Sequence, residues 1–138
     1  MGFRGMKRRK RMIYFLICLI IFVVAFIAFI FSNPLRRPVG VIRNDILKLT
    51  PIGSDMDDVL SVINRKVRSD GWRIMNISHI SGYADYSRPG SPTVGAKRIV
   101  VHMGRSRTGW IAVTVSWGFD EEGKLIDVYV RKHNTFLT

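Results

Sequence analysis

The chain has 138 residues, about the length of one domain, and a formal net charge of +12 at pH 7. Six of its 22 basic residues lie within residues 1–11, directly ahead of an uncharged apolar run. Because basic residues beside such a run orient it in a membrane, we assign them to topology and expect no nucleic-acid partner. The other 16 basic residues stand against 10 acidic ones. The remaining net charge of +6 would suit lipid headgroups, a wall polymer or an acidic protein face.

The apolar run at residues 12–31 contains twenty consecutive residues without a charge. As a helix it would be about 30 Å long, which is the thickness of the hydrocarbon core of a bilayer. We therefore predict a cytoplasmic basic segment at 1–11 and a transmembrane signal anchor at 12–31. The lipid bilayer is then the first expected partner, contacted through residues 12–31.

The alternative for this run is a cleaved signal peptide, which has a shorter apolar region ending in small residues. The run instead ends in Phe29, Ile30 and Phe31, which favours an uncleaved anchor. The basic cluster before it places the N-terminus in the cytoplasm. The sequence thus predicts a single-pass plasma-membrane protein with a linker at 32–43 and an extracytoplasmic domain at 44–138.

The chain has one cysteine, Cys18, which lies inside the apolar run. No intramolecular disulfide is possible, so the outer domain must be stable through packing alone. A lipid-modified cysteine would follow most of its apolar stretch and a small residue. Ile17 precedes Cys18 and most of the run comes after it, so we interpret Cys18 as a buried apolar thiol.

Two helices are predicted at the start of the outer domain. The first is short, from Ile42 to Leu49. The second runs from Asp55 to Arg68, with Ser54 as the expected N-cap and Gly71 ending it. Its apolar residues recur at helical spacing and form one stripe, which needs a sheet to cover it. The stripe consists of Met56, Val59, Leu60, Ile63 and Val67.

Four strands are predicted to follow, at residues 72–80, 97–103, 110–119 and 125–132. Alternation points Ile126, Val128 and Val130 of the last strand toward the core. Residues 120–124 form a hairpin turn in which Gly123 supplies a positive φ. The class is therefore α+β, with one or two helices packed in two layers on a three- to four-stranded antiparallel meander.

Two motifs of this domain resemble a known family. Gly53, Met56 and Val59 at the start of the second helix resemble the helix start of the SmpA/OmlA (BamE-like) small bacterial envelope domains. The segment from Val113 to Val130 is similar to the closing hairpin of that family. The resemblance covers roughly residues 45–132 and implies a helix layer on a three-stranded antiparallel sheet that binds proteins or lipid in the envelope. The chain would be a membrane-anchored relative.

No catalytic, cofactor or metal site is predicted. His79, His102 and His133 show none of the spacings of a zinc site. The only cysteine lies in the apolar run, and no Gly-x-Ser-x-Gly motif occurs. The segment at 104–109 lacks the Gly-Lys-Ser/Thr end of a phosphate-binding loop. We therefore expect a protein that is not an enzyme, with no cofactor, no metal and no small-molecule substrate.

Two regions are candidate partner-binding sites. The first is the sheet face opposite the core, where aromatic and basic residues of the kind found at binding hot spots gather. Its candidate residues are Arg98, His102, Trp110, Tyr129 and Arg131. The second is the loop at 81–96, which is either a mobile connector or a contact surface carrying Tyr83, Tyr86 and Arg88.

These observations predict an interaction or scaffold module tethered at the membrane, with a protein partner in the envelope. The alternative is an immunity-type or inhibitor protein that captures a toxin or hydrolase at the membrane surface. The sequence does not separate the two, nor does it separate the sheet face from the loop as the binding site.

Overall fold

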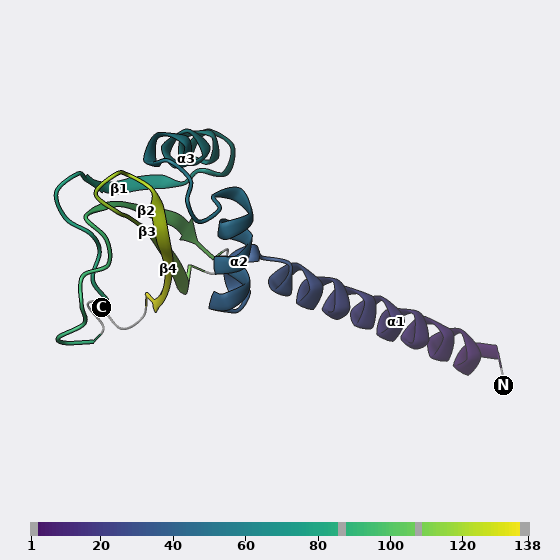
Figure 1. Cartoon of the computed structure of the whole chain (residues 1–138). Coiled ribbons are helices and arrows are strands. Elements are labelled where there is room, and N and C mark those ends of the chain that lie inside the picture. Colours follow the sequence, from purple (N-terminus) through teal and green to yellow (C-terminus); the bar gives the residue numbers. More distant parts are fainter. Residues whose placement is uncertain (1–2, 86–87, 107–108, 136–138) are drawn as a thin grey trace. The chain divides into compact units, whose positions relative to one another are not determined.

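The computed structural model describes residues 3–85, 88–106 and 109–135. It consists of two units, Met1–Asn33 and Pro34–Thr138. The described part of the second unit contains α2 (Val39–Leu49), α3 (Met56–Asp70) and four strands, β1 (Arg73–Ser78), β2 (Lys97–Arg105), β3 (Ile111–Phe119) and β4 (Leu125–Asn134) (Figure 1). A short 3-10 turn, η1 (Pro34–Arg36), precedes α2. The predicted α+β class is confirmed.

The first unit is essentially one helix, α1 (Phe3–Phe31). Its stretch Arg8–Phe29 has a mean hydropathy of 3.1, and none of it is buried. By length and composition this helix is able to cross a membrane. The helix includes basic residues that we assigned to a separate segment at 1–11, because nothing there interrupts helical geometry.

The two helices of the second unit differ from their predicted starts. Helix α2 begins at Val39, so residues 39–43 of the expected linker are helical, and Ile42 is buried. Helix α3 has Asp55 as its N-cap, so the prediction of Ser54 was wrong. The Ser54 hydroxyl donates instead to the carbonyl of Pro51 at 2.7 Å and is used by the preceding turn. Gly71 ends α3 with a φ of 72°, as predicted.

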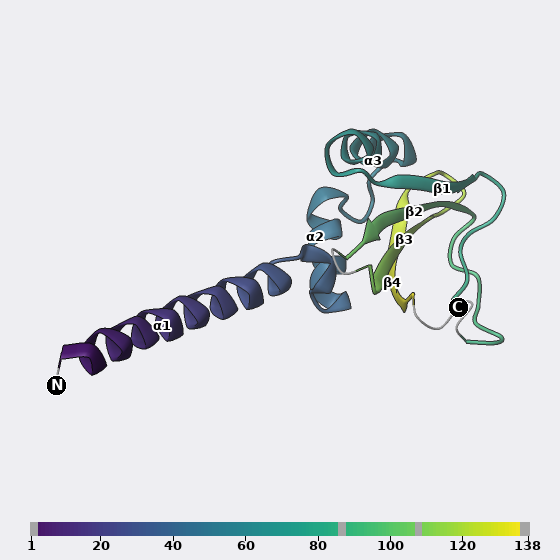
Figure 2. The same cartoon turned by 180° about the vertical axis from the view of Figure 1, so that it is seen from behind.

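The strands form one antiparallel sheet in the order β1-β2-β3-β4, which both views show (Figure 2). The predicted meander is therefore confirmed and extends to the fourth strand. The β3–β4 turn contains Gly123 at a φ of 85°, where a residue without a side chain is favoured. The backbone N–H of Met56, at the start of α3, donates to the Gly123 carbonyl at 2.8 Å.

Ile126 is the predicted core residue that the structure contradicts. It is 43% exposed, whereas Leu125 is 1% exposed. The cause is a register shift, because Phe119 pairs with Leu125 and the next pair is Gly118 with Asp127. Ile126 is the extra residue of this β-bulge and turns away from the core, while Val128 and Val130 are buried as predicted.

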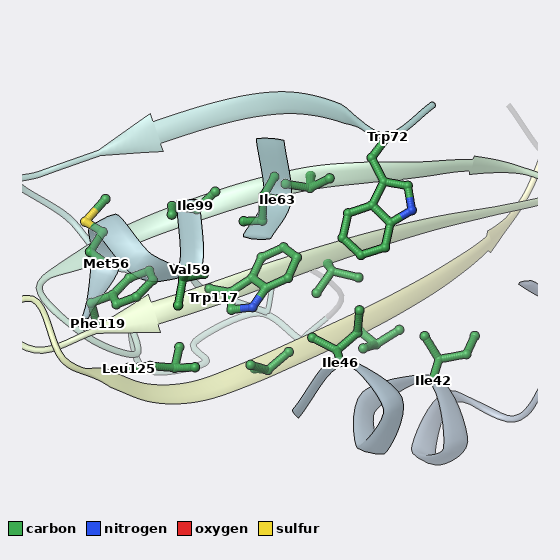
Figure 3. Close-up of a cluster of buried hydrophobic side chains, with 14 of the residues drawn as sticks. Ile42, Ile46, Met56, Val59, Ile63, Trp72, Ile99, Trp117, Phe119 and Leu125 are labelled. Carbon is green, nitrogen blue, oxygen red and sulfur yellow. The ribbon is translucent and has the colours of Figure 1, made fainter. Parts of the chain in front are cut away.

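One cluster of buried side chains contains residues of α2, α3 and the strands. Figure 3 shows Met56, Val59 and Ile63 of α3 meeting the side chains of the strands, with Ile42 and Ile46 entering from α2. The apolar stripe of α3 is thus used as the sequence predicts, with Leu60 and Val67 packed at its margin. The sheet side of this cluster includes Ile99, Val101, Val113, Val115, Trp117, Phe119, Leu125, Val128 and Val130. The opposite face of the sheet is left for other contacts.

Candidate functional site: a pocket on the open face of the sheet

The face of the sheet that turns away from the core is built from alternate residues of β2, β3 and β4. Val100 pairs with Ser116, and Ser116 pairs with Tyr129. The neighbouring row joins His102, Thr114 and Arg131 in the same way. Since directly paired residues project to the same side of a sheet, these side chains form one surface.

A pocket of about 210 Å³ lies on this surface. It is lined by Tyr83, Ala84, Arg98, Val100, Thr114, Ser116, Tyr129 and Arg131. Three of the predicted sheet residues, Arg98, Tyr129 and Arg131, therefore line the same pocket as Tyr83 from the predicted loop. The two regions that we treated as alternatives contribute to a single site.

The loop between β1 and β2 reaches the sheet because glycines leave room for it. Tyr83 and Val94 form a bridge within the loop, with N–H···O distances of 3.1 and 2.7 Å. A Cβ atom on Gly82 would lie 2.0 Å from the Val94 carbonyl oxygen. A Cβ atom on Gly118 of β3 would lie 2.8 Å from the Tyr83 ring. A larger residue at either position would push this part of the loop off the sheet.

Tyr83 holds the loop on the open face. It is 5% exposed, and its ring stacks on Tyr129 with ring centroids 5.9 Å apart. The Tyr83 hydroxyl donates to Asp127 Oδ2 at 2.7 Å, and Arg43 Nη2 of α2 donates to Asp127 Oδ1 at 2.8 Å. Burial and the neighbouring carboxylate raise the pKa of Tyr83, so it stays a neutral donor. The hydroxyl is thus used within the fold, and the ring forms a wall of the pocket.

The two arginines of the pocket differ in what they contact. The guanidinium of Arg98 donates to Asn76 Oδ1 and to the Gly82 carbonyl, each at 3.0 Å. It therefore ties β2 to β1 and to the loop. Arg131 is exposed on β4, and no hydrogen bond or ion pair of its guanidinium occurs among the described residues. Arg131 is consequently the cation of this pocket that can reorient toward a ligand.

The other predicted site residues lie outside the pocket lining. His102 is half-buried, and burial followed by the positive charges of His133, Arg105 and Arg73 lowers its pKa. Trp110, just before β3, is 52% exposed. Arg88 is exposed and lies 3.9 Å from a carboxylate oxygen of Asp85. Tyr86 falls outside the described residues.

The lining offers binding groups and no set of groups for acid–base or nucleophilic chemistry. Its described residues supply two guanidinium groups, two aliphatic hydroxyls and two phenol rings. Among the residues that the structure describes, no carboxylate, imidazole or thiol lines the pocket. Within residues 3–85, 88–106 and 109–135, no group of three potential metal ligands comes together. The arrangement is suited to holding a ligand by charge, hydrogen bonds and apolar contact.

Asp127 makes the attachment of the loop dependent on pH. Burial would raise the pKa of this carboxyl, but the hydrogen bonds from Tyr83 and Arg43 outweigh that effect and lower the pKa below its usual value of 3.8. The unfolded chain then binds a proton more readily than the folded chain. The stabilisation that the ionised Asp127 gives the folded chain is therefore fully present above the pKa of this carboxyl in the unfolded chain. It is lost as the pH falls through the pKa of the carboxyl in the folded chain.

We predict that Asp127→Asn is less stable than the unchanged protein at pH 7 and that the difference shrinks below about pH 4. Urea midpoints at both pH values measure this. The control is Glu121→Gln, at the exposed tip of the β3–β4 turn. If Asp127→Asn lowers the urea midpoint by the same amount at both pH values, the ionised carboxylate of Asp127 does not stabilise the fold as proposed.

Sequence reasoning missed the connection among Arg43, Tyr83 and Asp127, which lie on three separate elements. It also did not include Thr114 and Ser116 of β3, which line the pocket, among the candidate residues. The available signal was the pair of glycines, Gly82 in the loop and Gly118 within a strand, since a glycine inside a strand often marks a close approach by another segment.

The comparisons with known proteins add no relative. No protein-family model matches the chain, and no significant match was found among curated proteins or solved structures. The resemblance to the SmpA/OmlA domains therefore stays a prediction, and the function has to be argued from the site itself.

Proposed function

We propose that this chain is a membrane-tethered, non-enzymatic binding module of the cell envelope that holds a protein partner on the open face of its sheet. The observation that carries the proposal is the pocket in which Tyr83 of the loop meets Arg98, Tyr129 and Arg131 of the sheet. Tyrosine and arginine are enriched at the energetic centres of protein interfaces. The chemistry of the lining supports binding, since its described residues include no carboxylate or imidazole that would activate the Thr114 and Ser116 hydroxyls.

The proposed tether is α1. Within the candidate span Arg8–Phe29, the uncharged part 12–29 has 18 residues, which at about 1.5 Å per residue is long enough to cross the hydrocarbon core. The apolar core helix of a soluble protein would be buried, whereas none of this stretch is. The basic residues before it favour a cytoplasmic N-terminus and an extracytoplasmic second unit at the plasma membrane.

The second unit is proposed to be a two-layer domain of the SmpA/OmlA type. Its buried residues from α2 and α3 belong to the same cluster as the inward residues of the sheet, which supports one helix layer on one sheet. Such a layer leaves the other sheet face to the loop and to a partner.

In-cell photocrosslinking tests the proposal. A photoreactive phenylalanine analogue at Trp110, just before β3, replaces one exposed aromatic ring by another, and the same analogue at Asn64 on α3 is the control. We expect a discrete protein adduct from position 110 that is lost with Arg131→Gln and kept with Arg65→Gln, because Arg65 is exposed on α3. The identity of the adduct would separate a scaffold from an immunity-type protein.

Equal adducts from positions 110 and 64 would contradict binding through the open face. An adduct from position 110 that Arg131→Gln leaves unchanged would contradict a role for the pocket. The variants are compared at equal protein levels in the membrane, so that a loss of adduct reports binding and not expression.

A further inference from the structure

The lining of the pocket is divided between charged or polar groups and apolar groups. Arg131, Thr114 and Ser116 provide a guanidinium and two hydroxyls from adjacent strands β4 and β3. The Tyr83 and Tyr129 rings, with Val100 and Ala84, provide apolar contact area. A ligand that satisfies both parts needs hydrogen-bond acceptors at one end and an apolar group at the other.

The charge around the pocket favours an anion. Arg98 and Arg131 line it, and no acidic residue of the described part of the chain does. One row of paired residues runs from β1 into the pocket: Arg73 pairs with His102, His102 with Thr114, and Thr114 with Arg131, of which Thr114 and Arg131 line the pocket. Tyr83 of the lining donates a hydrogen bond to the carboxylate of Asp127, and the charge of that carboxylate is offset by its ion pair with Arg43. An anionic group would enter a positive local field there.

The size of the pocket limits what enters it. A pocket of about 210 Å³ is suited to a small group, such as one amino-acid residue with its carboxylate. The planar guanidinium of Arg131 is suited to a carboxylate, which it binds through two parallel hydrogen bonds.

We propose that the pocket binds the C-terminal residue of a polypeptide partner. Arg131, Thr114 and Ser116 hold the terminal carboxylate, and the apolar side chain of that residue lies against the Tyr83 and Tyr129 rings and Val100. This inference rests on the proposed function, since it names the part of the protein partner that the open face recognises.

Binding of short peptides to the full-length protein in detergent micelles tests the inference. The probe is an acetylated tetrapeptide ending in leucine with a free carboxylate, and its matched control is the same peptide with a C-terminal amide. In NMR spectra, we expect the peptide with the free carboxylate to shift the backbone N–H resonances of Thr114 and Ser116. The control peptide with the C-terminal amide is expected to bind at least tenfold more weakly. A peptide ending in glycine is expected to bind more weakly than the leucine peptide, because it lacks the apolar group.

Substitutions test whether the peptide binds in the pocket. Arg131→Gln is expected to weaken binding of the free acid about tenfold, and Arg131→Lys to recover part of the loss, since it keeps the charge without the planar fork. Thr114→Val removes a hydroxyl and suits a strand, so weaker binding by this variant reports the hydroxyl and not a loss of fold. Arg65→Gln, on α3, is expected to leave binding unchanged.

Three results would overturn the inference. The first is equal binding of the free acid and the amide. The second is inorganic phosphate, or nanodiscs of phosphatidylglycerol, displacing the peptide at equal or lower concentration, which would indicate a general anion site. The third is unchanged affinity in Arg131→Gln. The peptide could fail to bind while the crosslinked adduct from position 110 still forms and still depends on Arg131. That result would leave the proposed binding function in place and would contradict only the C-terminal residue as its ligand.

Discussion

Replacing Trp117 by alanine is expected to lower the free energy of unfolding of the α+β unit by about 3–5 kcal/mol. Trp117 is 1% exposed and lies in the cluster formed by the sheet and the helices (Figure 3). Its indole N–H donates to the Thr50 hydroxyl at 3.0 Å, and Thr50 donates in turn to the Ile46 carbonyl at 2.9 Å. The substitution would therefore leave a cavity and remove the hydrogen bond that joins β3 to the end of α2.

This loss is a large part of the stability of a unit of this size, since domains are stable by about 5–15 kcal/mol. Hydrogen exchange of the slowest amides of β3 in the full-length protein measures it, because those amides exchange through global unfolding. The matched control is Trp110→Ala, in which the tryptophan removed is 52% exposed. A loss below about 1 kcal/mol is expected there. Equal losses in the two variants would contradict the assignment of Trp117 to the core.

The elements were predictable because their signals are local. The stripe of α3, the alternation of β3 and the glycine of the β3–β4 turn each depend on residues a few positions apart. The errors arose where a local rule competed with a contact made elsewhere. Ser54 has the chemistry of an N-cap, but its hydroxyl bonds to Pro51. Ile126 fits the alternation of β4, but the bulge at the pairing of β3 and β4 reverses its direction.

The candidate site was predictable only in part. The alternation of the strands placed Arg98, Tyr129 and Arg131 on the open face, which the pairing confirms. The position of the loop was not predictable, because it depends on long-range contacts. Arg43 and Asp127 are 84 residues apart, and Tyr83 and Asp127 are 44 apart. Nothing in the local sequence pattern pairs such residues, and a long polar loop is typical of either a connector or a contact surface.

The second large effect concerns α1. Replacing Ile20 and Val24 by arginine places two charges one helical turn apart in the middle of the apolar stretch. Each arginine near the centre of a spanning helix costs about 2.5–3.5 kcal/mol on insertion scales, so the pair costs about 5–7 kcal/mol. We expect the unchanged protein to stay in the membrane during alkaline extraction and the double variant to be released. The control is Ile20→Leu with Val24→Leu, which keeps the apolar character.

Alkaline extraction alone does not show whether a released protein has lost its apolar helix by cleavage or keeps a helix that does not span, so the mass of the purified protein is measured as well. An uncleaved anchor predicts the mass of the full 138-residue chain, 15.8 kDa. The large side chains at the end of the apolar run, Phe29 and Phe31, do not fit the small-residue pattern that cleavage requires. A mature protein that lacks the apolar stretch would contradict the anchor while leaving the pocket and its partner unaffected. A full-length protein released as easily as the arginine variant would show that α1 does not span the bilayer.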